Sequence, residues 1–117
     1  MKYKPGLHIL ARVSTPVEVK LRSHQLFKAQ VKSLIEALDL TCLGEIYHDF
    51  EPEGFTATVC LSESHLAIHT WPEHQMATFD VYLSNNLKDN TATCRTLYEQ
   101  LLSFFEAKEL HKEEVLR

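Results

Sequence analysis

The sequence lacks long apolar runs and blocks of like charge. Its formal charge of −4, from 12 basic and 16 acidic side chains, is spread along the chain. There is therefore no electrostatic footprint for nucleic acid or for an anionic membrane, and neither partner is expected. The apolar run near the start is interrupted by Arg12, too soon for a signal peptide or a spanning helix. We therefore expect a cytoplasmic protein.

Cysteine is also scarce. Cys42, Cys60 and Cys94 are odd in number, widely spaced and without a CxxC pair. This pattern argues against a disulfide framework and against a structural zinc site. We expect three free thiols in a reducing compartment.

The length of the chain limits what one copy can enclose. With 44% hydrophobic residues, residues 1–117 are expected to form one domain around one packed core. The sequence contains no repeat of fixed period and no low-complexity segment. A pocket larger than a shallow cleft would need a second subunit, so we expect at least a homodimer with active sites near the subunit boundary.

Apolar periodicity predicts both strands and helices. Alternation and β-branched residues predict strands over these segments: 7–14, 41–50, 55–62, 64–71 and 77–83. Apolar residues at spacings of three and four predict helices over 23–40 and 90–105, the second capped by Asn90 or Thr91. Residues 108–117 are expected to form a frayed helical tail.

The segment 55–62 indicates which face of the sheet is covered. Its apolar side chains fall on one face: Phe55, Ala57, Val59 and Leu61. Its polar side chains fall on the other face: Thr56, Thr58, Cys60 and Ser62. The predicted fold is therefore an α+β two-layer sandwich, mainly an antiparallel sheet with two helices on one face. The polar face is left free for chemistry or for a partner subunit.

The segment 61–73 concentrates hydroxyl, imidazole and carboxylate groups around the single tryptophan. A serine near two histidines suggests an activated nucleophile with a base, although neither a GxSxG elbow nor an obvious third member is present. His65 and His69 would face the same side of an extended segment, so they are also candidate metal ligands. A third ligand would be His48 or His74. The remaining histidines are interpreted as ordinary surface or core residues: His8, His24 and His111.

The same segment resembles the processing segment of S-adenosylmethionine decarboxylase proenzymes of the small bacterial and archaeal type. In that family a Glu-Ser-His is followed by a histidine and then by Thr-Trp-Pro-Glu, and residues 63–73 match this pattern almost without gaps. The resemblance extends more loosely to the turn 50–54, to the segment 80–82 and to the strand after Gly6. It therefore spans most of the chain.

The resemblance implies that the chain cleaves itself between Glu63 and Ser64, giving fragments 1–63 and 64–117. The Ser64 hydroxyl would attack the Glu63 carbonyl, and elimination and hydrolysis would leave a pyruvoyl group on residue 64. The pyruvoyl carbonyl would form a Schiff base with the substrate amine and act as the electron sink for decarboxylation. The resemblance implies neither an external cofactor nor a metal.

The resemblance also assigns roles to five other residues. His69 resembles the family histidine that assists the elimination, a general-base role that suits an imidazole. Thr56 stands where the family usually has a serine that assists processing, and the hydroxyl is retained. Phe50 and Trp71 resemble the aromatic pair that sandwiches the adenine of this small-molecule substrate. Glu73 resembles the carboxylate that binds the ribose or the polar end of the substrate.

The match breaks at the position of the proton donor. The family normally has a cysteine four residues after the aspartate at position 80, and this chain has Ser84 there. A thiol with a pKa of roughly 8.5 is a usable acid near neutrality, whereas a serine hydroxyl is a far weaker one. A relayed water, Tyr82 or Cys60 would have to substitute. The loop 74–76 also departs from the family pattern.

These departures leave three hypotheses for the function. The first is decarboxylation of S-adenosylmethionine for polyamine (spermidine) synthesis, which the residues assigned to the adenine favour. The second is a pyruvoyl-dependent arginine or ornithine decarboxylase of the same family. The third is a non-enzymatic paralogue that binds and regulates an active relative.

Overall fold

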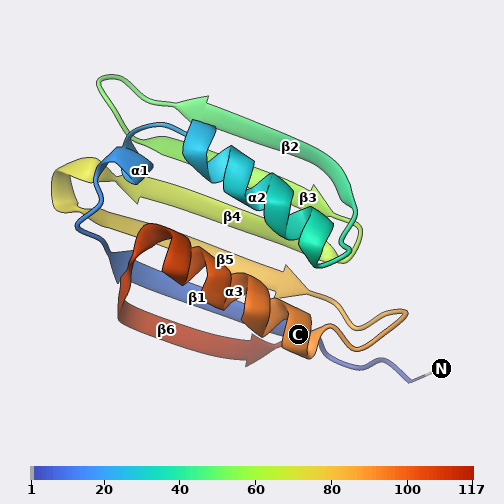
Figure 1. Cartoon of the computed structure of the whole chain (residues 1–117). Coiled ribbons are helices and arrows are strands. Elements are labelled where there is room, and N and C mark those ends of the chain that lie inside the picture. Colours follow the sequence, from blue (N-terminus) through green and yellow to red (C-terminus); the bar gives the residue numbers. More distant parts are fainter. Residues whose placement is uncertain (1) are drawn as a thin grey trace.

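One antiparallel sheet runs through the computed structural model, which describes residues 2–117 (Figure 1). The six strands are β1 (Leu7–Ser14), β2 (Cys42–Asp49), β3 (Phe55–Leu61), β4 (Ser64–Trp71), β5 (Met76–Leu83) and β6 (Lys108–Leu116). Their order in the sheet is β2-β3-β4-β5-β1-β6, and every neighbouring pair is antiparallel. The segment that carries the motif, β4, therefore lies in the interior of the sheet.

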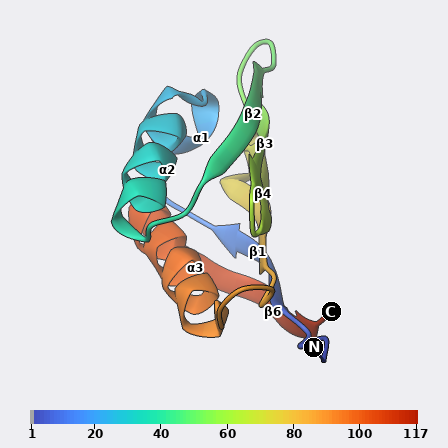
Figure 2. The ribbon, with the colours of Figure 1, turned by 90° about the vertical axis from the view of Figure 1, so that its right-hand side faces the viewer.

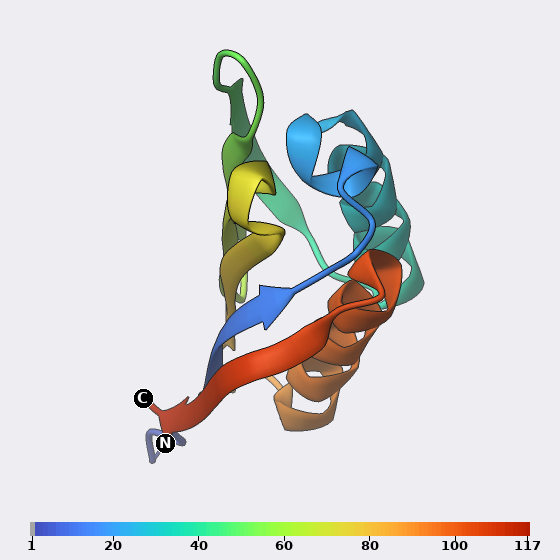
Figure 3. The same ribbon diagram turned by 90° about the vertical axis from the view of Figure 1, so that its left-hand side faces the viewer.

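All helices lie on one face of this sheet, as the two edge-on views show (Figures 2 and 3). They are α1 (Val19–Arg22), α2 (Gln25–Ala37) and α3 (Thr91–Phe105), and the 3-10 turn η1 (Pro72–His74) joins β4 to β5. The apolar stripes of α2 and α3 are buried against the sheet: Phe27, Val31, Leu34, Cys94, Leu97, Tyr98, Leu101 and Phe105. The predicted two-layer α+β sandwich is confirmed. Within residues 2–117, no helix has the length and apolarity needed to cross a membrane.

The strands alternate as predicted, which leaves one face of the sheet without helices. In β3, Phe55, Ala57 and Val59 are buried beneath the helices, whereas Thr58 and Cys60 are exposed. We call the opposite, helix-free surface the open face. On the central strands the open face carries Thr56, Thr58, Cys60, His65, Ala67, His69, Trp71, Thr78, Asp80, Tyr82, His8, Leu10 and Arg12. Its polar character shows that this sheet does not bury both faces within one chain.

The helical tail predicted for residues 108–117 is wrong. These residues form the edge strand β6, which pairs with β1 from Leu7 opposite Leu116 to Ser14 opposite Lys108. Every residue of β6 is exposed, so the apolar alternation that identifies a strand is almost absent from its sequence. The free edge of β1, rather than a local pattern, determines this conformation.

The predicted helix boundaries are close to those observed. The helix predicted over 23–40 ends at Ala37, because Asp39 adopts a left-handed conformation with φ of 55° that ends the helical turn. The helix predicted over 90–105 begins at Thr91 with Asn90 as its N-cap residue. The single turn α1 was not predicted, because four residues are too few to show a period.

Candidate active site

The predicted cleavage point lies in the tight turn between β3 and β4. Ser62 and Glu63 form this turn, and Ser64 is the first residue of β4. The backbone N–H of Ser84 donates a hydrogen bond of 2.8 Å to the carbonyl oxygen of Glu63. This is the carbonyl that the Ser64 hydroxyl would attack, and a donor at that oxygen stabilises the negative charge that develops there. The turn therefore fits the conversion of residue 64 into a pyruvoyl group.

The backbone of Ser64 is itself unusual. Its φ is 155°, at the edge of the region that side chains rarely adopt. Residues held in sparsely populated backbone conformations cluster at active sites. This conformation supports the same assignment as the hydrogen bond at the Glu63 carbonyl.

Residues outside the motif hold Ser84 in place. The side-chain amide of Asn90 donates a hydrogen bond of 2.8 Å to the carbonyl of Ser84, and the side-chain oxygen of Asn85 accepts one of 2.7 Å from the backbone of Asn90. On the other side, a Cβ added to Gly6 would lie 2.9 Å from Cα of Ser84. Sequence reasoning identified none of these positioning contacts, because each depends on how the loop after β5 folds back on the chain.

The two residues assigned to processing form a hydrogen-bonded pair. Oγ1 of Thr56 lies 2.7 Å from Nδ1 of His69 and 3.4 Å from the carbonyl oxygen of Ile68. The hydroxyl has one proton, and the Ile68 carbonyl can only accept. Thr56 therefore donates to Ile68 and accepts the proton on Nδ1 of His69. This arrangement leaves Nε2 of His69 free to act as a base.

The three residues assigned to the substrate line a groove together with this pair. The groove has a volume of about 420 Å³ and is lined by Phe50, Glu51, Pro52, Glu53, Phe55, Thr56, His69, Thr70, Trp71 and Glu73. Phe50 and Trp71 are 49% and 37% exposed, so both rings are accessible to a ligand. One groove thus brings together Phe50, Trp71 and Glu73 with the predicted base.

The structure does not bring this groove to Ser64 of the same chain. Ser64 begins β4, whereas His69 and Trp71 lie towards its other end. Five residues of extended strand separate Ser64 from His69, a distance of about 17 Å at roughly 3.4 Å per residue. Each chain therefore carries two half-sites: Ser64 with Ser84 at one end of β4, and the groove with its base at the other.

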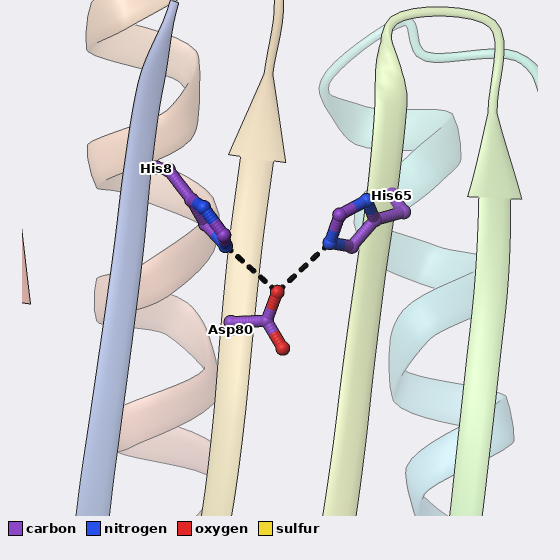
Figure 4. Close-up of side chains that lie close together, drawn as sticks. All are labelled: His8, His65 and Asp80. Atoms are coloured by element: carbon purple, nitrogen blue, oxygen red, sulfur yellow. Dashed lines mark hydrogen bonds and ion pairs between the residues drawn. The ribbon is translucent and has the colours of Figure 1, made fainter. Parts of the chain in front are cut away.

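A third group of polar side chains on the open face was not predicted. His8 on β1 and His65 on β4 both approach Asp80 on β5, and each Nε2 lies 2.8 Å from the same oxygen, Oδ2 (Figure 4). His8 is 8% exposed although it is polar. Only the pairing of β4, β5 and β1 brings these residues together. The one signal in the sequence is a histidine between two buried apolar residues of β1.

The contact of Arg117 with His8 indicates whether this group is a metal site or a hydrogen-bond network. The ligand atoms of His8, His65 and Asp80 all lie within 4.8 Å of one another, a spacing that a metal ion would also require. However, Nη1 of Arg117 lies 3.3 Å from Nδ1 of His8 and can only donate. Nε2 of a neutral His8 must then carry the ring proton and donate to Asp80, which disfavours coordination through this atom. Among residues 2–117, the metal pairing suggested for His65 and His69 is not formed, because His69 is bonded to Thr56 instead.

Comparison with known proteins identifies the family. The family model described as S-adenosylmethionine decarboxylase matches residues 7–117. The chain is 40% identical over 77 residues to the S-adenosylmethionine decarboxylase proenzyme of Aquifex aeolicus; this match covers 66% of the chain but only 57% of that relative. It is 30% identical over 117 residues to the proenzyme of Clostridium botulinum strain Langeland, covering 100% of the chain and 97% of the relative.

A solved structure agrees with this assignment. The crystal structure of the adenosylmethionine decarboxylase from Aquifex aeolicus VF5 superposes with a TM-score of 0.80 at 26% identity. The superposition covers 99% of this chain and 91% of the other. The aligned part therefore includes nearly all of the described elements. The chain belongs to the S-adenosylmethionine decarboxylase family.

Proposed function

We propose that this chain is a self-processing, pyruvoyl-dependent decarboxylase of S-adenosylmethionine that serves polyamine (spermidine) synthesis. The observation that carries the proposal is the hydrogen bond from the Ser84 backbone to the Glu63 carbonyl, directly before Ser64. This bond extends the ladder between β4 and β5 by one pair, and it thereby places a donor at this carbonyl with a reactive hydroxyl beside it. Self-cleavage requires both.

The cleavage follows from the groups present. The Ser64 hydroxyl attacks the Glu63 carbonyl while the Ser84 N–H stabilises the oxygen, and the peptide bond becomes an ester. A base then removes the Cα proton of residue 64, the carboxylate of Glu63 leaves, and hydrolysis releases ammonia. Nε2 of His69 is the base, since its other nitrogen is held by Thr56. The resulting pyruvoyl group supplies a carbonyl that reacts with the substrate amine and accepts electrons as carbon dioxide leaves.

The groove supplies the contacts for the substrate. The accessible rings of Phe50 and Trp71 suit a flat base such as adenine, and their faces also attract the positive sulfonium group. Glu73 offers a carboxylate that accepts hydrogen bonds from ribose hydroxyls. Ornithine carries no flat group for two stacking rings, and neither ornithine nor arginine carries the ribose hydroxyls that Glu73 would accept from.

The separation of the half-sites supports an assembly of two copies. Cleavage requires a base within hydrogen-bonding reach of residue 64, but His69 of the same chain lies about 17 Å away along β4. The open face is polar and uncovered in one chain, so a second copy can pack there. We infer a homodimer in which Ser64 of one chain meets His69 of the partner subunit. The groove of that partner then lies at the same site.

The first test is an intact mass spectrum of the purified protein under denaturing conditions. Fragments 1–63 and 64–117, the latter with a blocked pyruvoyl end, are the expected result. The Ser64→Ala chain should remain whole, because it lacks the attacking hydroxyl. A wild-type chain that stays whole after long incubation would contradict the proposal and favour a non-enzymatic paralogue.

The second candidate, an arginine or ornithine decarboxylase, rests on two departures from the family pattern, the serine at position 84 and the loop 74–76. The cleaved protein should be incubated separately with S-adenosylmethionine, arginine and ornithine, and amine products measured. Carbon dioxide release from S-adenosylmethionine alone supports the first candidate. Release from a basic amino acid alone would replace it with the second.

A further inference from the structure

We propose that His65 is a catalytic residue of the decarboxylation, the one that delivers a proton to the α-carbon of the product. Asp80 and His8 are its positioning residues. This proposal rests on the proposed function, because it concerns a step of that reaction. It is carried by the network in Figure 4 and by the place of His65 next to residue 64.

The reaction itself creates the need for a donor. When the bond between the α-carbon and the carboxylate breaks, carbon dioxide leaves and its electron pair is shared between the α-carbon and the pyruvoyl group. A proton must then form a new C–H bond at the α-carbon, and solvent later restores that proton to the donor. A general acid must therefore stand beside residue 64. Ser84, directly after β5, is a poor donor because a hydroxyl holds its proton tightly.

The sheet places His65 where this acid is needed. His65 follows residue 64 in β4 and points onto the open face, whereas the side chain of Ser64 alternates towards the helix side, so the pyruvoyl end freed by cleavage must turn towards the open face to meet it. It lies directly opposite Tyr82 on β5, so it is the diagonal neighbour of Asp80 on one side and of Ser84 on the other. Diagonal neighbours on one face are about 7–8 Å apart, within reach of a long side chain. The imidazole therefore lies within reach of position 84.

The hydrogen-bond network determines which nitrogen is available. Arg117 donates to Nδ1 of His8, so a neutral His8 donates from Nε2 to Asp80. The carboxylate of Asp80 then accepts a second proton, from Nε2 of His65. Nδ1 of His65 is left to exchange a proton with the substrate.

The other candidates are less well placed. Cys60 lies opposite His65 on the far side from β5, so a whole strand separates it from Ser84. Tyr82 lies directly opposite His65 on the same face of the sheet. However, the guanidinium of Arg117 covers its ring at 4.7 Å, and a phenol is a weaker acid than an imidazolium. Only His65 combines the position with a fixed orientation and an imidazole, a side chain suited to proton transfer.

The test uses the self-cleaved protein with His65→Gln, and with His111→Gln as the matched control on the exposed edge strand. We expect the His65→Gln chain to lose about a hundredfold or more in kcat with little change in KM, and His111→Gln to match the wild type. After turnover, intact mass of fragment 64–117 should show alanine at residue 64 in the His65→Gln protein. Alanine arises when the proton reaches the carbon of residue 64 instead of the substrate, after which water cleaves the remaining C=N bond and releases the decarboxylated substrate as an aldehyde. A merely structural role for His65 would not produce it.

Rescue adds a second readout. Ser84→Cys combined with His65→Gln places a thiol acid at the neighbouring position, and it should restore turnover and keep residue 64 free of alanine. Asp80→Asn should cleave normally, lower kcat by about tenfold and accumulate alanine more slowly. If the His65→Gln chain is not cleaved, the Asp80→Asn variant serves as the test instead. Failure of both variants to cleave would overturn the proposal and assign the network to cleavage.

The outcomes also separate this proposal from the proposed function. A cleaved His65→Gln or Asp80→Asn protein with wild-type turnover and no alanine would overturn the role of His65 and leave the decarboxylase assignment intact. Absence of cleavage and turnover in the wild type would instead overturn the proposed function.

Discussion

At the scale of single residues, the hydrogen bond between Thr56 and His69 decides which imidazole nitrogen acts as the base. Thr56→Val removes the acceptor for the Nδ1 proton, and Thr56→Ser retains it. Because one hydrogen bond contributes about 1 kcal/mol, we expect self-cleavage to slow by about fivefold in Thr56→Val and to stay near the wild-type rate in Thr56→Ser. The fraction of whole chain over time, measured by mass spectrometry, checks this. Equal rates for both variants would contradict it.

Gly6 also matters as a single residue, because its missing side chain leaves room for the backbone at Ser84. A Cβ at this position would lie 2.9 Å from Cα of Ser84, whereas one at Gly44 would meet no atom within 4 Å. Gly6→Ala should therefore lower the free energy of unfolding by about 1–3 kcal/mol and slow cleavage, because the Ser84 N–H moves away from Glu63. Gly44→Ala is the control and should change neither. Thermal unfolding and the cleavage rate provide the two measurements.

The motif residues could be predicted from the sequence because their identities and spacing are local. Phe50, Thr56, His69, Trp71 and Glu73 occupy one groove, as neighbours on β3, β4 and the adjoining turns must. The partners of His65 could not be predicted in this way. Its bonds to Asp80 and through it to His8 depend on the register of three strands, which no local pattern encodes.

At the scale of elements, the central strands and both long helices were predictable because each buries one face. β6 was not, because all of its residues are exposed and its pairing with β1 replaces apolar alternation as the cause of its structure. α3 carries the clearest case of a buried stripe. Its Cys94 is 0% exposed and packs against β1 and β5, where its thiol lies near the carbonyls of Leu7 and Val81.

This burial makes the reactivity of Cys94 a probe of α3. Burial raises the pKa of the Cys94 thiol from 9.0 to about 11. Iodoacetamide at about pH 8 should therefore modify the exposed Cys42 and spare Cys94 until denaturant is added. Peptide mass mapping checks this result, and labelling of Cys94 at the rate of Cys42 would contradict it.

The sign of the pH effect on stability follows from the same shift. Between about pH 9 and pH 11 the unfolded thiol ionises while the folded one stays neutral, so the stabilising contribution is lost as pH rises.

At the scale of the whole molecule, sharing of half-sites between two copies can be tested by mixing defects. Ser64→Ala and His69→Asn chains should each remain whole when expressed alone. In a mixed dimer, Ser64 of the His69→Asn chain faces an intact His69 of the partner subunit, so only the His69→Asn chain should be cleaved. Co-expression followed by intact mass measurement distinguishes the two chains. Cleavage of His69→Asn in isolation, or no cleavage in the mixture, would rule out shared sites.

The strand order has a further consequence for refolding after cleavage. Residues 1–63 supply β1, β2 and β3, and residues 64–117 supply β4, β5 and β6, yet β1 lies between β5 and β6. The proposed cleavage would thus produce two polypeptides whose strands interleave in one sheet. No line drawn between two neighbouring strands separates one polypeptide from the other. Before cleavage, folding is unimolecular; afterwards, refolding requires two different chains to meet and its rate depends on concentration. Maturation would therefore make unfolding hard to reverse, since a matured copy that unfolds in dilute solution refolds only slowly.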